Sequence, residues 1–233
     1  MAEPAQSATV LSVTDLTPHV RQLVLLPKTQ KILFRPGQWV SLQLPVGIKP
    51  PLNRAYSLAE PPSQTGQLTL VFDRVPEGTG SNYLYGLKPG DELLMSGPYG
   101  NFSLPPSLDR ELLLISRYTG IVPIRCMLKH LAIVGPLPAA ILIAVGPAKE
   151  ELLYHEELLA LTAKQPSFRY LPMVMKGTDE EVVEAVLTVL RPLVAGKPMT
   201  PWLSGVKGFV RPLRAYLMEA GYERKEIRTE TYD

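Results

Sequence analysis

The pattern of apolar and polar positions changes in character part-way along the chain. Up to about residue 105, apolar residues come in short runs rich in Val, Leu and aromatic side chains, separated by turn sequences such as Lys88-Pro-Gly-Asp91. Runs of this kind predict strands, which we place at 8–14, 20–26, 39–44, 54–59, 68–74 and 91–96. Short strands at such spacing are typical of an antiparallel barrel or sandwich. One short helix is predicted at 81–87, with Ser81 as its N-cap or in its first turn.

From residue 111 onward, strands alternate with helices. Strands are predicted at 112–116, 140–145, 168–174, 202–204 and 226–230, and helices at 121–131, 150–163, 179–190 and 208–220. This alternation predicts a parallel sheet covered by helices on both faces. The expected fold therefore has two domains, an N-terminal antiparallel β-barrel over 1–106 and a C-terminal α/β domain with a parallel sheet over 107–233.

Composition excludes several classes of function. The chain has 233 residues, of which 45% are hydrophobic and 20% charged, as in an ordinary globular protein. Its net charge of +2 is too small to indicate a nucleic-acid partner. The single cysteine, Cys126, excludes an intrachain disulfide and a cysteine-ligated iron–sulfur cluster within this chain, and its helical position predicts a buried structural thiol. The three histidines lie far apart, so no metal site is predicted.

The sequence predicts neither a signal peptide nor a membrane span. The N-terminus lacks the basic and apolar regions of a signal peptide. The apolar run 131–145 is interrupted by Gly135, Pro136 and Pro138, which makes it too short to cross a bilayer. A cytoplasmic location is therefore expected.

The sequence Arg54-Ala-Tyr-Ser57 falls on a predicted strand. Successive side chains of a strand alternate between its faces, so Arg54 and Tyr56 are expected on one face and Ser57 on the other. A guanidinium presents a planar fork of donors to phosphate, and a tyrosine offers a ring to stack on. The pair suits a ligand with a phosphate and a flat ring system. Taken alone, these four residues are better explained as an ordinary strand with a surface arginine and a half-buried tyrosine.

Glycine-containing turns supply further candidate sites. The turn 78–81 opens a helix, where exposed N–H groups favour an anion, although a simple glycine turn with an N-cap explains it as well. Thr119 and Gly120 follow the first parallel strand, where ligands bind in open α/β sheets. The turn 202–208 occupies a similar position, and an ordinary loop is an equal alternative. For the glycines in 97–102 we expect a structural corner.

Together these motifs resemble the ferredoxin–NAD(P) reductase superfamily of flavoproteins. Arg54-Ala-Tyr-Ser57 matches the family's FAD-binding Arg-x-Tyr-Ser/Thr, and Gly80-Ser81 matches the helix start that receives the FAD pyrophosphate. The turn that precedes the Arg-x-Tyr-Ser/Thr motif in the family is similar to Phe34-Arg-Pro-Gly-Gln-Trp-Val40. Gly97-Pro-Tyr-Gly-Asn-Phe102 is similar to the end of the flavin barrel, and Arg228-Thr-Glu-Thr-Tyr-Asp233 to the family's carboxyl terminus.

The resemblance implies an FAD-dependent NAD(P)H:acceptor oxidoreductase. Hydride would pass from NADH or NADPH to flavin N5, and single electrons would then leave for a ferredoxin-like protein or a small acceptor. Arg54 would pair with the FAD pyrophosphate, Tyr56 would pack on the isoalloxazine, and Ser57 would lie near N5. The implied catalytic residues are Tyr56, Ser57 and Ser204. The implied cofactor-binding residues are Arg54, Tyr56, Ser57, Val71, Phe72, Gly80, Ser81, Asn82, Thr119 and Gly120.

The nicotinamide half departs from the family pattern. The usual Gly-Gly-Thr-Gly-x-x-Pro is Arg117-Tyr-Thr-Gly-Ile-Val-Pro123, and the usual Cys-Gly-Pro is Ser204-Gly-Val206. The loop Gly146-Pro-Ala-Lys149 lacks a common arginine. One hypothesis is that NAD(P)H binds in an altered way, with Arg117 or Lys149 contacting phosphate. The alternative is an FAD-bearing electron-transfer subunit that has lost or altered this ligand. A module without flavin is a third hypothesis, which the intact Arg54 motif opposes.

Overall fold

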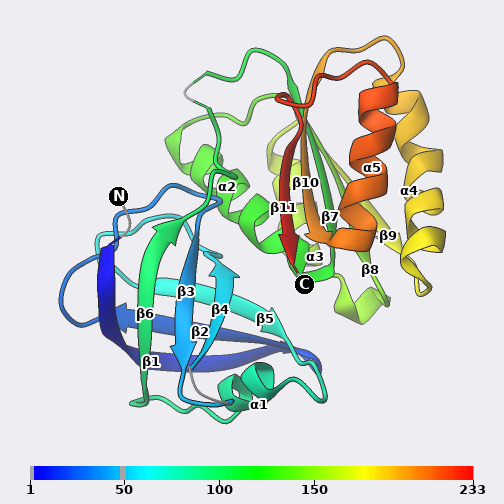
Figure 1. The fold of residues 1–233 in the computed structure, drawn as a ribbon. Coiled ribbons are helices and arrows are strands. Elements are labelled where there is room, and N and C mark those ends of the chain that lie inside the picture. Colours follow the sequence, from blue (N-terminus) through cyan, green and yellow to red (C-terminus); the bar gives the residue numbers. More distant parts are fainter. Residues whose placement is uncertain (1–2, 48–50, 106, 233) are drawn as a thin grey trace. The chain divides into compact units, whose positions relative to one another are not determined.

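The computed structural model describes residues 3–47, 51–105 and 107–232, and these form two compact units (Figure 1). The first unit comprises 1–104 together with Arg125–His130, and the second comprises Pro105–Ile124 and the chain from Leu131 onward. The predicted domain boundary at Pro106 lies outside the described residues. Asp233, the last residue of the predicted carboxyl-terminal motif, also lies outside them, as do Met1 and Ala2.

The first unit is a six-stranded antiparallel sheet in the order β4-β3-β6-β1-β2-β5. An isolated antiparallel bridge between Leu58 and Leu70 joins its two edge strands, β4 and β5. The sheet is therefore barrel-like but remains open along the rest of these edges. The antiparallel fold predicted for this half is confirmed. The strands are β1 (Glu3–Thr17), β2 (Val20–Pro27), β3 (Trp39–Leu44), β4 (Leu52–Ser57), β5 (Leu68–Asp73) and β6 (Glu92–Tyr99).

Alternation along the strands builds the core of this unit. In β3, Val40, Leu42 and Leu44 are fully buried while the residues between them are only partly covered, which is the period of two that a strand imposes. The short helix α1 (Thr79–Tyr85) adds Leu84 to the same core. It begins two residues earlier than predicted because Gly78 takes the N-cap position.

The second unit is a five-stranded parallel sheet in the order β11-β10-β7-β8-β9. All residues of β8 are buried, as expected for a parallel strand covered on both faces. Helices α4 and α5 lie side by side, and their apolar residues form one core with the sheet (Figure 1). The strands are β7 (Glu111–Arg117), β8 (Ala140–Gly146), β9 (Phe168–Val174), β10 (Met199–Val206) and β11 (Arg228–Tyr232), and the helices are α2 (Ile121–Val134), α3 (His155–Lys164), α4 (Asp179–Val194) and α5 (Lys207–Glu219).

Several predicted bounds were wrong. The helix expected at 150–163 is interrupted, with a single 3-10 turn at Lys149–Glu151 followed by α3. Between them Tyr154 adopts a left-handed conformation with a φ of 60°, which breaks the helix and is unusual for a non-glycine residue. The strand expected at 54–59 is Leu52–Ser57, and α4 continues through Pro192.

Cys126 is buried and free, as its helical position predicted. Burial raises the pKa of its thiol to about 12, so the group stays protonated near neutral pH. Among the described residues, no helix has both the length and the apolar character needed to cross a membrane.

Candidate functional site

The Arg54 motif lies on β4, an edge strand of the antiparallel sheet. Here Arg54 is paired with Leu42, Tyr56 with Val40 and Ser57 with Trp39. Arg54 is exposed, Tyr56 is half-buried, and Ser57 is only 4% exposed. The register therefore places Arg54 and Tyr56 on the face of the sheet that carries Leu42 and Val40, and Ser57 on the opposite face with Trp39, which is the predicted alternation.

Two aromatic rings connect the two edges of this sheet. The Tyr56 ring on β4 packs against Phe72 on β5, with ring centroids 5.5 Å apart and an interplanar angle of 56°. Burial raises the pKa of Tyr56 to about 12, although the positive charge of Arg54 opposes the shift. The phenol is therefore neutral at physiological pH and presents an aromatic surface with a hydroxyl donor.

The side chain of Arg54 passes close to the first turn of α1. A Cβ added at Gly80 would lie 3.5 Å from Arg54 Cγ and 3.1 Å from Leu52 Cδ2, so the glycine permits this approach. Arg54 Nη1 donates to the carbonyl oxygen of Asn53 at 2.9 Å. Within the described part of the chain, no carboxylate forms an ion pair with Arg54. The structure thus brings two predicted motifs together and leaves this guanidinium able to bind an external anion.

Other predicted cofactor residues in this unit already make protein contacts. The Ser81 hydroxyl accepts from Val75 N–H at 2.9 Å and donates to Val75 O at 3.1 Å, and Asn82 Nδ2 donates to Pro76 O at 2.8 Å. Val71 and Phe72 are 4% and 3% exposed. The side chains of Ser81 and Asn82 are therefore already bonded within the protein, and those of Val71 and Phe72 are too buried to offer a ligand much surface.

This arrangement fits FAD, which combines a pyrophosphate with a flat ring system. The Arg54 guanidinium is a charged donor without a competing carboxylate among the described residues. The Tyr56 ring lies two residues further along the same strand. Gly80 keeps the space beside Arg54 free of a side chain.

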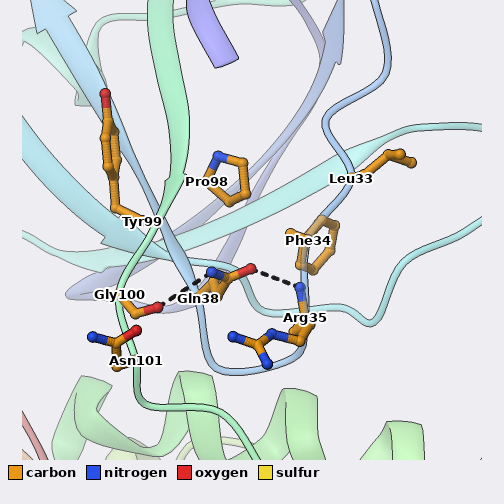
Figure 2. Close-up of a pocket in the computed structure, with 8 residues that line it drawn as sticks. All are labelled: Leu33, Phe34, Arg35, Gln38, Pro98, Tyr99, Gly100 and Asn101. Atoms are coloured by element: carbon orange, nitrogen blue, oxygen red, sulfur yellow. Dashed lines mark hydrogen bonds between the residues drawn. The ribbon is translucent and has the colours of Figure 1, made fainter. Parts of the chain in front are cut away.

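A hollow in the first unit lies where two other motifs meet (Figure 2). Gln38 Nε2 donates to the carbonyl oxygen of Gly100 at 3.2 Å, and Gln38 Oε1 accepts from Arg35 N–H at 2.8 Å. Gly37 has a φ of 94°, and a Cβ there would lie 1.8 Å from Phe102 O. These contacts support the structural corner expected for 97–102. The hollow has a volume of about 500 Å³ and is lined by Leu33, Phe34, Arg35, Gln38, Pro98, Tyr99, Gly100 and Asn101.

In the second unit, the structure brings Gly120 and Ser204 together at the carboxyl ends of β7 and β10. A Cβ at Gly120 would lie 2.3 Å from Ser204 O, so only glycine fits. Ser204 is fully buried and its hydroxyl donates to Tyr232 Oη at 3.4 Å. Thr119 is half-buried in the single turn Tyr118–Gly120 that follows β7. The turn after β7 and the carboxyl end of β10 therefore form one packed edge.

The two side chains that replace family glycines both contact the protein itself. Arg117 forms an ion pair with Asp179 and donates to Gly177 O at 3.5 Å. Tyr118, with a φ of 51°, donates its hydroxyl to Glu151 Oε2 at 2.8 Å, and Glu151 is 7% exposed. Sequence reasoning missed Asp179 and Glu151 as partners, because helix-start acids are common and nothing in the local pattern indicates what they contact.

Comparison with known proteins identifies the family. A family model described as the oxidoreductase FAD-binding domain matches residues 7–104. The chain is also 31% identical over 243 residues to ferredoxin–NADP reductase B of Sorangium cellulosum, covering 100% of this chain and 99% of that protein. The chain belongs to the ferredoxin–NADP reductase family of FAD-dependent oxidoreductases. The resemblance predicted from the Arg54 motif is thereby confirmed.

Other members of the ferredoxin–NADP reductase family are longer. The phenol hydroxylase P5 protein of Acinetobacter pittii is 28% identical over 235 residues, which are 97% of this chain and 65% of that protein. The crystal structure of an Amycolatopsis cytochrome P450 reductase superposes with a TM-score of 0.83 at 25% identity, covering 98% of this chain and 69% of that one. The chain thus spans about two thirds of the length of these two proteins, and its antiparallel and parallel halves match the fold of the P450 reductase.

Within the described residues, no group of three or more His, Cys, Asp or Glu side chains is placed to hold a metal ion. The candidate cofactor-binding residues are Arg54 and its neighbours in the first unit. In the second unit they are Thr119, Gly120 and Ser204 at the edge of the parallel sheet.

Proposed function

We propose that this chain is an FAD-dependent reductase that passes electrons from NAD(P)H to a separate acceptor, such as a ferredoxin-like protein. The observation that carries the proposal is Arg54, which lies on an open strand edge beside Gly80 and has no carboxylate partner among the described residues. The relative named ferredoxin–NADP reductase B supports the same chemistry and the same kind of acceptor.

In the proposed flavin half, residues 1–106, Arg54 pairs with the FAD pyrophosphate and Tyr56 packs on the isoalloxazine. Ser57 lies near flavin N5, and Val71, Phe72, Gly80, Ser81 and Asn82 line the rest of the site. FAD supplies the ability to accept a hydride and to release single electrons, while the protein positions the ring and excludes water. The neutral Tyr56 phenol holds its proton over the working range of pH, because its pKa is about 12.

In the proposed nucleotide half, residues 107–233, Thr119 and Gly120 contact the dinucleotide at the carboxyl end of β7. Ser204 is assigned to the nicotinamide end of the site. Because its side chain is buried against Tyr232, the adjoining backbone at Gly205 is the part of this turn best placed to approach a ligand. Since NAD(P)H is made and used inside cells, we propose the cytoplasm as the location.

Anaerobic titration of the FAD-loaded protein tests this function. We expect the flavin absorbance to bleach on addition of NADH or NADPH, with the faster donor identifying the physiological one. A protein that binds FAD and is reduced by dithionite, but by neither nucleotide, would contradict the NAD(P)H step. Failure to bind FAD at all would contradict the whole proposal.

A second candidate function is an FAD-bearing electron-transfer subunit that receives its electrons from another protein. The engagement of Arg117 with Asp179 and of Tyr118 with Glu151 favours it, because both side chains stand where the family has glycines. The titration separates the two functions, since only the first requires bleaching by a nucleotide.

A further inference from the structure

Arg117 and Asp179 belong to a cluster at the carboxyl edge of the parallel sheet. Arg117 ends β7, and Asp179 is the first residue of α4. A Cβ at Gly205 would lie 3.3 Å from Arg117 Cβ, so the arginine stem runs along the carboxyl end of β10. A Cβ at Gly208 would lie 1.9 Å from Asp179 Oδ2, so the carboxylate lies against the first turn of α5. An arginine, a helix start and a carboxylate thus meet at one place.

The position of Asp179 is well defined by its own helix. Thr178 caps α4 by accepting from Glu181 N–H at 3.3 Å, and Glu181 Oε2 accepts from Thr178 N–H at 2.8 Å. This reciprocal capping box orients the first turn of α4 and with it the Asp179 side chain. Arg117 adds a hydrogen bond to Gly177 O, so it binds the same turn at two points.

The carboxylate occupies a position that would suit a phosphate. It is an anion beside the first turn of a 13-residue helix and pairs with a guanidinium, the two features that phosphates use in proteins. The pair also stands at the carboxyl ends of parallel strands, where dinucleotides bind in such sheets. Asp179 and a bound phosphate would therefore compete for Arg117.

We propose that Asp179 limits the affinity of this protein for dinucleotides by holding Arg117, and that Arg117 exchanges Asp179 for a phosphate of NAD(P)H when the nucleotide binds. The inference rests on the proposed function and adds a specificity-determining residue to its nucleotide site. The competing phosphate is either the 2′-phosphate, which only NADP(H) carries, or the pyrophosphate, which both nucleotides carry.

Equilibrium binding of NADP⁺ and NAD⁺ to the FAD-loaded protein tests the exchange, because the oxidised nucleotides bind without turnover. We expect Asp179→Asn to lower the Kd by about tenfold, the effect of gaining one charge-assisted hydrogen bond. In an Arg117→Ala background the same substitution should change the Kd by less than about twofold, because the two residues act as a pair. Tightening for NADP⁺ alone identifies the 2′-phosphate, and tightening for both nucleotides identifies the pyrophosphate.

A second variant reaches the same carboxylate from the opposite side. In Gly208→Ala, the new methyl group must displace the Asp179 carboxylate, so we expect a tightening of similar size. Glu180→Gln is the matched control, because it removes one negative charge from the adjacent exposed position and should leave the Kd within about twofold. Melting temperature and FAD content confirm that each variant is folded.

The outcomes separate this inference from the proposed function. If the wild-type protein binds a nucleotide but Asp179→Asn leaves the Kd unchanged or raises it, the exchange is wrong while the reductase function stands. Tightening that persists without Arg117 would also overturn it, by showing a general charge effect. If neither the wild-type protein nor any variant binds either nucleotide, both the exchange and the use of NAD(P)H are wrong.

Discussion

Two arginines of this protein stand at predicted phosphate positions, and their surroundings differ. Arg54 lies exposed on a strand edge of the antiparallel sheet, where it donates to the carbonyl oxygen of Asn53 and forms no ion pair with any described carboxylate. Arg117 lies at the end of a parallel strand, where it pairs with Asp179 and contacts Gly177. The comparison teaches that a carboxylate partner does not exclude an anion site, but it makes an external anion compete for the guanidinium.

The two halves also differ in how far apart in sequence their site residues are. Arg54, Tyr56 and Ser57 share one strand, so their relative positions follow from the geometry of that strand alone. Arg117 meets a partner 62 residues away, which reaches it only through the packing of α4 and α5 on the sheet. The arrangement of the flavin motif can therefore be predicted from the sequence, whereas the pairing of Arg117 with Asp179 cannot.

The largest expected effect is a loss of stability when a closely packed glycine is replaced by alanine, and this loss should differ between the two halves. Gly120→Ala places a methyl group 2.3 Å from a backbone oxygen of Ser204, which cannot move without shifting the sheet edge. We expect it to lower the free energy of unfolding by about 3 kcal/mol, as overpacking does. Gly80→Ala meets only side-chain carbons at 3.1 Å or more, so we expect about 1 kcal/mol or less. Urea unfolding of both variants measures the difference, and equal losses would contradict this comparison.

Removal of Arg54 tests whether its guanidinium is available to the flavin. We expect Arg54→Ala to raise the Kd for FAD about 100-fold, because two charge-assisted hydrogen bonds to phosphate are lost. The Kd of Arg54→Lys should lie between those of the wild-type protein and Arg54→Ala, since a lysine keeps the charge without the planar guanidinium. Fluorescence titration of the apoprotein with FAD gives the Kd. Arg224→Ala, at another exposed arginine, serves as the control, and a loss as large in this control would show that Arg54 has no specific role.

A third arginine, Arg125, is buried and has its guanidinium bonded to other groups of the protein. It is 5% exposed and donates to Glu60 Oε1 at 2.8 Å and to Ala59 O at 3.0 Å, while Lys129 also contacts Glu60 at 2.5 Å. Because Glu60 is itself one third exposed, we expect Glu60→Gln to cost about 1.5 kcal/mol of stability, less than breaking a fully buried pair. The exposed Glu77→Gln is the control and should cost less than about 0.5 kcal/mol.

The same carboxylate predicts a dependence of stability on pH. Burial opposes ionisation of Glu60, but hydrogen bonds from Lys129 and Arg125 outweigh it and hold its pKa below the ordinary value of 4.5. The stabilisation is therefore fully present above pH 4.5 and is lost as the pH falls through the lowered pKa. We expect the stability gap between wild type and Glu60→Gln to narrow below pH 4.5, measured by urea unfolding across pH; a constant gap would contradict the pairing.

The smallest expected effects concern the two site tyrosines. Tyr118→Phe removes a hydrogen bond to the buried Glu151, so we expect a loss of about 1 kcal/mol of stability. Tyr56→Phe keeps the ring that packs on Phe72, so we expect FAD affinity within about threefold of wild type. Because the pKa of Tyr56 is about 12, both proteins should show the same pH dependence of FAD binding up to pH 10. A divergence between them below that pH would show that the phenol ionises in the site.

Much of the fold was predictable because it depends on local periodicity. The period of two in β3 and the continuous apolar run of β8 identified a half-buried antiparallel strand and a fully buried parallel one. The break before α3 was missed because the left-handed conformation of Tyr154 leaves no mark on the apolar pattern. The early start of α1 was missed because Gly78 replaces the polar N-cap that the pattern favours.

The sequence by itself determined the order of elements and the Arg54–Tyr56–Ser57 motif, since neighbours on one strand keep their spacing in any fold that contains it. Tertiary structure alone decided that Gly80 lies beside Arg54, that Gly120 packs on Ser204, and that Asp179 holds Arg117. Each of these contacts joins residues from different elements, and their distance depends on how the strands pair and the helices pack rather than on any local pattern. The availability of a charged side chain is for this reason a property of the folded protein.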